Sequence, residues 1–165
     1  MRRLEIKDLN VNMTELLENR WALLTAADGE GCNPMTVSWG GIGRLWNLPV
    51  VTVYVRPQRY TKSLMDAEQY FSLTFLPEEM HEVAAFCGAK SGRDVDKVKE
   101  CGLTVRRDER APYFAEGELT FICRKVYEQD MAGECFVDPT VEEKNYPGKD
   151  YHRMYVGEIL AVLEK

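Results

Sequence analysis

The segment from residue 33 to residue 61 constrains the fold of this chain most strongly. The β-branched and aromatic run Val50–Val55 predicts a strand, because such side chains pack well on a pleated surface. Upstream, residues 35–39 alternate apolar and polar side chains with the period of two typical of a strand that has one face on a core. Gly40, Gly41 and Gly43 between these runs predict a turn or a close backbone approach to a ligand. A strand–turn–strand setting excludes a Rossmann unit or a P-loop here.

The rest of the chain predicts further strands and only short helices. Strands are expected at 21–27, 70–76, 119–126 and 151–159, with a leading strand or arm at 4–10. Short helices are expected at 12–17, at 61–65 with Thr61 as N-cap, at 80–87, and after Asp94 as N-cap. Residues 128–149 are polar and turn-rich and give the least legible signal. Many strands, few helices and no βαβ alternation predict a mainly β, antiparallel barrel.

Composition narrows the class of protein. A chain of 165 residues fits one domain over residues 1–165, and 27 acidic against 21 basic side chains disfavour a nucleic-acid partner. No apolar run reaches the ~18 to 20 residues of a membrane span, and no apolar segment follows the basic N-terminus as in a signal peptide. Five widely spaced cysteines without a CxxC pair disfavour a disulfide framework or a metal site. We therefore expect a cytoplasmic protein with neither a membrane nor a metal.

The sequence Arg56-Pro57-Gln58-Arg59-Tyr60-Thr61 follows the Val50–Val55 strand directly. Arginines beside a helix N-terminus suit a phosphate, because free backbone N–H groups and the helix dipole both favour an anion there. The alternative for this loop is a surface turn with two solvated arginines.

Several motifs, taken in order, resemble one family. They are Asn-Pro-Met-Thr-Val-Ser-Trp from Asn33, the glycine-rich turn, Pro-Val-Val and Arg-Pro-x-Arg-Tyr-Thr, and then Ser91 to Lys97 and a histidine before Val-Gly-Glu near the C-terminus. This set resembles the flavin reductase-like FMN-binding split β-barrel family, and its flavoredoxin-type branch most closely. The resemblance covers nearly the whole chain and implies a split barrel with short excursion helices around FMN.

The resemblance also implies a set of site residues. Asn33, Met35, Thr36, Val37 and Ser38 are expected along the flavin ring and ribityl chain, and the remaining phosphate-side and loop residues are Arg56, Arg59, Tyr60, Thr61, Ser91, Arg93 and Lys97. Trp39 and Trp46 are candidates for stacking on the ring or closing the pocket, with an ordinary core position as the alternative. His152 is the catalytic candidate, near the flavin, with a hydrogen-bonded strand histidine as the alternative.

Three functions compete at this level. The first is an NAD(P)H-dependent oxidoreductase that binds and reduces FMN, for which the cofactor carries the chemistry and no catalytic triad is needed. The second is an electron carrier of the flavoredoxin type, reduced by a redox partner protein. The third is a non-redox FMN-binding protein. Family resemblance further implies a homodimer with each flavin near the interface, since two-fold pairing is the commonest symmetry.

Overall fold

The fold is an antiparallel sheet that curls into an open barrel, in a computed structural model that describes all residues from 1 to 165. Its strands run in the order β3-β2-β6-β9-β10-β5-β4, and β1 adds to β10. All pairings are antiparallel. The bounds are β1 Arg2–Leu4, β2 Ala22–Asp28, β3 Gly31–Val37, β4 Gly40–Leu45, β5 Leu48–Val55, β6 Tyr70–Phe75, β9 Leu119–Asp130 and β10 Arg153–Glu164. Since β3 and β4 end the order and do not pair with each other, the barrel is split, as predicted.

The barrel interior is one apolar core built by alternation along the strands. In β5, Val51, Val53 and Val55 are buried in it, while the residues between them are half-buried. Each such buried valine stabilises the fold by roughly 1.5–3 kcal/mol relative to an exposed one. Twenty buried side chains form this core. They are Leu16, Leu17, Met65 and residues of β2, β3, β5, β6, β9 and β10.

Gly157 lets the two longest strands bend. The register between β9 and β10 shifts at this glycine, and a Cβ atom there would lie 2.4 Å from Cζ of Phe71 and 3.0 Å from Cβ of Cys123. A side chain at this position would therefore push the sheet away from its own core. The β-bulge and the missing Cβ together permit the curvature that forms the barrel.

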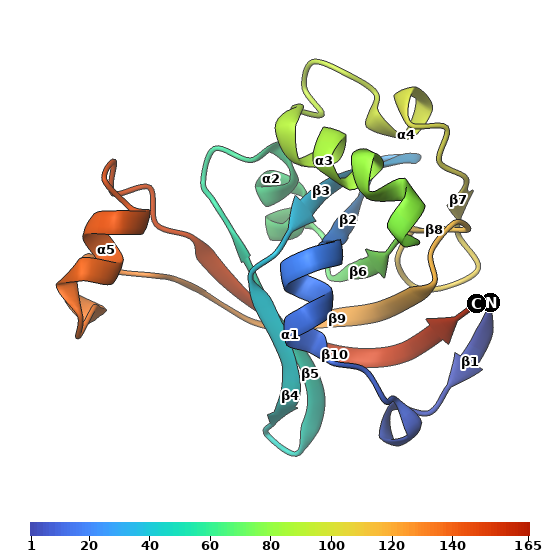
Figure 1. Cartoon of the computed structure of the whole chain (residues 1–165), viewed down its shortest axis with the longest axis horizontal. Helices are drawn as coiled ribbons and strands as arrows, with labels where there is room; N and C mark the ends of the chain where they lie inside the picture. The colour runs from blue at the N-terminus through green and yellow to red at the C-terminus, as the bar shows by residue number, and fades with distance from the viewer.

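The helices are short and lie mostly on one side of the barrel. They are α1 Met13–Glu15 with the π turn η2 Leu16–Arg20, α2 Tyr60–Ala67, α3 His81–Ala89, α4 Lys97–Glu100 and α5 Pro139–Asn145, with 3-10 turns at Ile6–Asp8, Glu78–Met80 and Gly133–Cys135. Figure 1 shows α2, α3 and α4 gathered at the β2–β3 end of the sheet. There a second apolar cluster joins Leu23 of β2 to Ala84 and Cys87 of α3. None of the helices is long and apolar enough to cross a membrane.

Three local predictions were wrong. Residues 40–45 form strand β4 rather than a turn, because Gly40 faces the backbone of β5, where a Cβ would lie 2.4 Å from the Thr52 carbonyl oxygen. Helix α4 is capped by Asp96, whose carboxylate accepts from the Lys99 amide at 3.1 Å, and not by Asp94. The chain leaves β3 at Val37, so the alternation predicted through residue 39 ends two residues early.

An arm projects from the barrel between β9 and β10. Residues 131–152 carry a 3-10 turn and α5 away from the body, at the left of Figure 1. At the opposite side of the figure the two termini lie side by side, since β1 pairs with the end of β10. The arm gave little sequence signal because it packs on few other elements and so lacks a regular apolar pattern. A two-stranded ribbon, β7 Val105–Arg106 with β8 Tyr113–Phe114, completes the fold.

Candidate functional site

A small cationic cavity lies where the start of α2 meets the loop between α3 and α4. It has a volume of about 150 Å³. Its lining residues are Gln58, Arg59, Tyr60, Thr61, Ala89, Lys90, Ser91, Gly92 and Lys97. Five of the residues predicted from the sequence, separated by more than thirty positions between Thr61 and Lys97, therefore meet at one place.

Three cations, Arg59, Lys90 and Lys97, line this cavity without any carboxylate partner. Lys97 is only 3% exposed, and its Nζ donates to the carbonyl oxygens of Pro34 and Cys87 at 2.9 Å each. Arg59 donates to the carbonyl oxygens of Gly88 at 2.7 Å and Cys87 at 3.3 Å. Burial, reinforced by the charge of Arg59, lowers the pKa of Lys97 to about 8. A buried cation without a counter-ion is costly, so the surroundings of Lys97 favour a bound anion.

The start of α2 adds backbone donors to the same place. Arg59 holds the N-cap position, and no side chain caps the helix. Thr61, predicted to be the cap, lies inside the first turn, where its buried hydroxyl accepts from Nδ2 of Asn33 at 2.7 Å. The prediction of a Thr61 cap was therefore wrong, because this hydroxyl ties α2 to β3 instead. The uncapped N–H groups of the first turn remain available to an anion.

Gly92 lets the α3–α4 loop close over β3 and α2. A Cβ on Gly92 would lie 2.0 Å from Oδ1 of Asn33 and 2.8 Å from Cδ1 of Tyr60. The adjacent Arg93 stacks over the Tyr60 ring, 5.1 Å from its centroid, and donates to the Gln58 carbonyl at 3.3 Å. Only a glycine permits this approach. Gly92 was missing from the predicted site, although its place between Ser91 and Arg93 in the motif could have indicated it.

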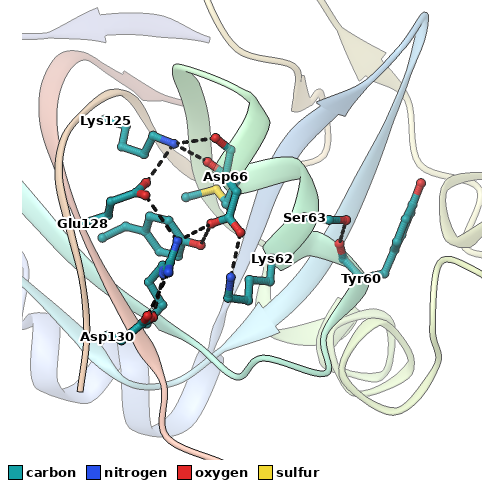
Figure 2. Close-up of polar contacts among 10 residues, drawn as sticks. Tyr60, Lys62, Ser63, Asp66, Lys125, Glu128 and Asp130 are labelled. Atoms are coloured by element: carbon teal, nitrogen blue, oxygen red, sulfur yellow. Dashed lines mark hydrogen bonds and ion pairs between the residues drawn. The ribbon is translucent and has the colours of Figure 1, made fainter. Parts of the chain in front are cut away.

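A polar network fixes α2 to the barrel (Figure 2). The Asp66 carboxylate accepts from Lys62 at 2.6 Å, from Arg153 of β10 at 3.2 Å, and from the Tyr155 hydroxyl. Lys125 of β9 donates to the Met65 and Asp66 carbonyl oxygens at 2.6 and 3.1 Å. These contacts hold the last turn of α2, so the first turn is presented to the cavity in a defined position. Nothing in the sequence around residue 66 distinguishes this aspartate from a solvated one.

A larger and more apolar cavity lies at the other end of β3. It has a volume of about 600 Å³ and is lined by Met13, Thr14, Leu17, Glu18, Trp21, Ser38, Trp39, Gly40, Gly41 and Ile42. Ser38 and Trp39 thus face a cavity between the first helical segment and the edge of β4. Asn33 and Ser38 lie five residues apart along the chain. At ~3.3 Å per residue, an extended segment of this length spans roughly 16 Å. One cavity, lined by cations, and a second, more apolar one therefore lie near the two ends of β3.

Trp39 and His152 meet beside this second cavity. Trp39 is 45% exposed, and its ring centroid lies 5.0 Å from that of His152. His152 is buried, and its Nδ1 is 2.8 Å from the Tyr146 hydroxyl. Burial, with the nearby Arg56 charge, lowers the pKa of His152 to about 4, so the imidazole is neutral at pH 7.

Arg56 belongs to this end and not to the cationic cavity. Its guanidinium pairs with Asp150 at 2.5 Å, donates to the Asn145 carbonyl at 2.9 Å, and lies over the Tyr146 ring at 5.1 Å. These partners all come from the base of the arm. The paired arginines of the predicted phosphate loop are thus divided between two sites.

The remaining predicted residues lie outside both cavities. Met35 and Val37 are buried in the barrel core, and the Thr36 hydroxyl donates to the Ala84 carbonyl of α3. Trp46 is at the tip of the β4–β5 hairpin, where its ring is 5.8 Å from that of Tyr127. Ser38 and Trp39 thus line the apolar cavity, and Asn33 reaches the cationic cavity through its hydrogen bond to Thr61.

Comparison with known proteins agrees with the class that this fold and site define, a flavin-binding split barrel. Residues 15–165 match the family profile described as Flavin reductase like domain. The chain therefore belongs to the flavin reductase-like family. A comparison with curated protein sequences finds no significant match.

Solved structures of similar fold include a flavoredoxin from Methanosarcina acetivorans, with 26% identity, a TM-score of 0.69, and 88% of this chain and 68% of that chain covered. An FMN-binding protein from Thermus thermophilus with bound p-hydroxybenzaldehyde has 20% identity, a TM-score of 0.68, and coverage of 89% and 72%. An NADH:FAD oxidoreductase from Streptomyces globisporus has 15% identity, a TM-score of 0.65, and coverage of 89% and 76%. The fold is thus shared by a flavoredoxin, an FMN-binding protein and an NADH:FAD oxidoreductase.

Proposed function

We propose that this protein binds FMN and transfers electrons from NAD(P)H through it to an acceptor. The observation that carries the proposal is the pair of half-buried Arg59 and buried Lys97, cations with carbonyl partners only, beside an uncapped helix start. A phosphate supplies the missing anion. The apolar cavity at the far end of β3 suits a flat ring with a polar rim.

The residues present fit the parts of FMN. Arg59, Lys97, Ser91 and the first N–H groups of α2 would hold the phosphate. Ser38 and the free edge of β3 would bond the ring's polar rim, with Trp39 beside it. When bound, FMN supplies the hydride and electron chemistry. What the chain contributes is binding and orientation.

His152 acts in this proposal as a positioning residue. Its neutral ring is fixed by the hydrogen bond to Tyr146 and packs on Trp39. A neutral imidazole brings no charge to the ring site at pH 7, so its contribution is to hold the indole at the mouth of the apolar cavity. The arm, through Tyr146, thereby influences the ring end of the site.

An electron carrier is the second candidate, favoured by the 26% identity with a flavoredoxin over 88% of the chain. Both candidates require flavin and differ in the electron donor. The experiment titrates FMN into the purified protein and then adds NADH or NADPH without oxygen while the flavin absorbance is followed. Bleaching at a catalytic rate supports the oxidoreductase. Tight FMN binding without bleaching supports a carrier with a redox partner protein, and a failure to bind FMN contradicts both.

The proposal includes a homodimer in the cytoplasm. Large apolar side chains are exposed on the arm and hairpin, with Val137 fully exposed, Trp46 55% and Val141 45% exposed. A second copy related by a two-fold axis would cover some of these side chains. All five cysteines are free, as a reducing compartment would leave them. Sedimentation of the flavin-loaded protein as a 19 kDa species would contradict the dimer.

A further inference from the structure

The amine of Lys97 is buried and held in place on the wall of the cationic cavity. Its Nζ donates to the carbonyl oxygens of Pro34 and Cys87 at 2.9 Å each. Together with Cε, these two contacts occupy three of the four tetrahedral directions at the nitrogen. The fourth direction carries the third proton of the ammonium or, in the neutral amine, the lone pair. A neutral Lys97 is therefore a nucleophile that its own hydrogen bonds orient.

The surroundings of this amine favour its neutral form. Burial and the charge of Arg59 lower the pKa of Lys97 to about 8. The other titratable groups that act on it are two thiols, which burial keeps protonated, since the pKa of Cys87 is raised to about 12 and that of Cys101 is also raised. At pH 8 roughly half of the Lys97 amines are thus neutral, against roughly 0.3% for an ordinary lysine. A lysine amine made neutral in this way is an activated nucleophile.

The cavity beside this amine suits a small phosphoryl compound. Arg59 and Lys90 also line it, and the uncapped N–H groups at the start of α2 add donors. Asp94 and Asp96 precede Lys97 in the chain but form no ion pair with its amine, whose partners are carbonyl oxygens. At ~30 Å³ for each water molecule, the volume of about 150 Å³ holds a phosphoryl group with a two-carbon acyl group and excludes a whole nucleotide.

We infer that Lys97 is an acylation site whose donor is a small acyl phosphate, of which acetyl phosphate is the simplest. The inference rests on the proposed function in one respect, since the phosphoryl group of the donor would occupy the cavity assigned to the phosphate of FMN. Arg59 and the α2 N–H groups would hold that phosphoryl group. The Nζ lone pair attacks the acyl carbon, the C–N bond forms and the C–O bond to the phosphoryl group breaks. One proton of the amine leaves with the inorganic phosphate, so one amine and one acyl phosphate give one amide and one phosphate.

Acylation of Lys97 would prevent FMN from binding. It removes the positive charge and places an acyl group in the space that the phosphate of FMN needs. An amide nitrogen keeps a single N–H, so it can no longer donate to both the Pro34 and the Cys87 carbonyl oxygens. The loading of the protein with its cofactor would thus respond to the supply of acyl phosphates, and bound FMN would protect Lys97.

The test incubates the flavin-free protein with acetyl phosphate at pH 8 and follows each lysine by peptide mass spectrometry. Lys99, exposed two residues further along α4, is the internal control. A less basic amine attacks more slowly when neutral, which offsets part of the gain in neutral fraction, so we expect Lys97 to react about tenfold faster or more. FMN or inorganic phosphate should slow Lys97 and leave Lys99 unchanged. The acetylated protein should lose about tenfold or more in FMN affinity, the order of one charge-assisted hydrogen bond, and keep its riboflavin affinity.

A second donor separates recognition of the phosphoryl group from reactivity of the amine. Acetic anhydride transfers the same acyl group and carries no phosphoryl group. Arg59→Ala raises the pKa of Lys97 in both reactions but removes a phosphoryl contact in only one, so it should slow acetyl phosphate severalfold more than acetic anhydride. Arg93→Ala is the matched control, because this guanidinium binds the Gln58 carbonyl outside the cavity. It should leave the ratio of the two rates unchanged.

The outcomes keep the acylation site and the proposed function apart. A Lys97 that reacts no faster than Lys99, or that inorganic phosphate does not protect, overturns the inference, and so does an equal effect of Arg59→Ala on the two donors. Normal FMN binding with slow acetylation therefore leaves only the proposed function standing. Fast, phosphate-sensitive acetylation in a protein that fails to bind FMN supports the acylation site and contradicts the proposed function.

Discussion

Arg56 and Arg59 stand three residues apart in one loop, and the structure gives them opposite surroundings. Arg56 is neutralised by Asp150 and covered by Tyr146 of the arm. Arg59 is surrounded by carbonyl oxygens, and burial lowers its pKa because no carboxylate compensates for the lost water. A guanidinium that already has its counter-ion holds structure together, whereas one without a counter-ion is prepared for a ligand. The comparison therefore favours Arg59 over Arg56 for the proposed contact with the phosphate.

The largest effect is expected for Arg59→Ala. Removing this guanidinium should weaken FMN binding by about 1.5–3 kcal/mol, the range for a hydrogen bond to a charged group. Riboflavin, which lacks the phosphate, provides the control, and its affinity should not change. Isothermal titration with both ligands measures the difference. An equal loss for riboflavin would show that Arg59 supports the fold and not the phosphate.

The pH dependence of FMN binding tests whether Lys97, like Arg59, lies beside the phosphate of FMN. The pKa of Lys97 is about 8 in the free protein, below its ordinary 10.5. An anion favours the protonated amine, so FMN affinity should stay level below pH 8 and fall above it by up to about tenfold per pH unit. Lys97→Met should bind FMN more weakly and lose this dependence. A wild-type affinity that stays constant from pH 7 to pH 10 would contradict a phosphate beside Lys97.

The Lys97 amine also affects the free energy of unfolding, which should rise with pH where FMN affinity falls. Since the folded-state pKa lies below the unfolded value, the unfolded chain binds more protons between pH 8 and pH 10.5. Burial of Lys97 therefore costs stability fully below pH 8, and the cost is relieved as the pH rises through this window. Denaturant unfolding of wild type against Lys97→Met, without flavin, measures it.

Thr36 lies on β3 between the two cavities, and its replacement should affect the stability of the fold without affecting FMN binding. Because its hydroxyl donates to the Ala84 carbonyl, Thr36→Val should cost about 0.5–1.5 kcal/mol of unfolding free energy while FMN affinity is kept. Ser38→Phe is the matched change at an exposed residue just after β3, and it should fill the apolar cavity and reduce flavin binding. Chemical denaturation and FMN titration of both variants give the result. Loss of FMN affinity in Thr36→Val with unchanged stability would show that the Thr36 hydroxyl contacts the flavin.

The smallest effect on FMN is expected for Arg56→Ala, below about 0.5 kcal/mol if its guanidinium serves only the arm. The loss of its contacts to Asp150, Asn145 and Tyr146 should instead release the base of the arm. Limited proteolysis within residues 131–152 and hydrogen exchange of Tyr146 report that release. A loss of FMN affinity as large as that of Arg59→Ala would erase the distinction between the two arginines.

The barrel and the chemical class were predictable because they depend on local patterns. Alternation such as Val51, Val53 and Val55 is written in consecutive residues and is obeyed by the core. Arg59 was also recognisable, since a phosphate site needs cations and helix N–H groups at a strand end, whereas Ser91 and Lys97 were selected by the family resemblance. Trp46 was selected for its residue type alone, and the hairpin carries it away from both cavities.

The sequence by itself determined most of the strands, the antiparallel barrel and the cations near a helix start, because each follows from the order of neighbouring side chains. Only the tertiary structure decided which arginine remains unpaired. Asp150 lies 94 positions from Arg56, and Lys97 meets the Pro34 carbonyl across 63 positions. Charges, burial and cavities are properties of distances in space, and the loops that bring these residues together leave no periodic trace in the chain.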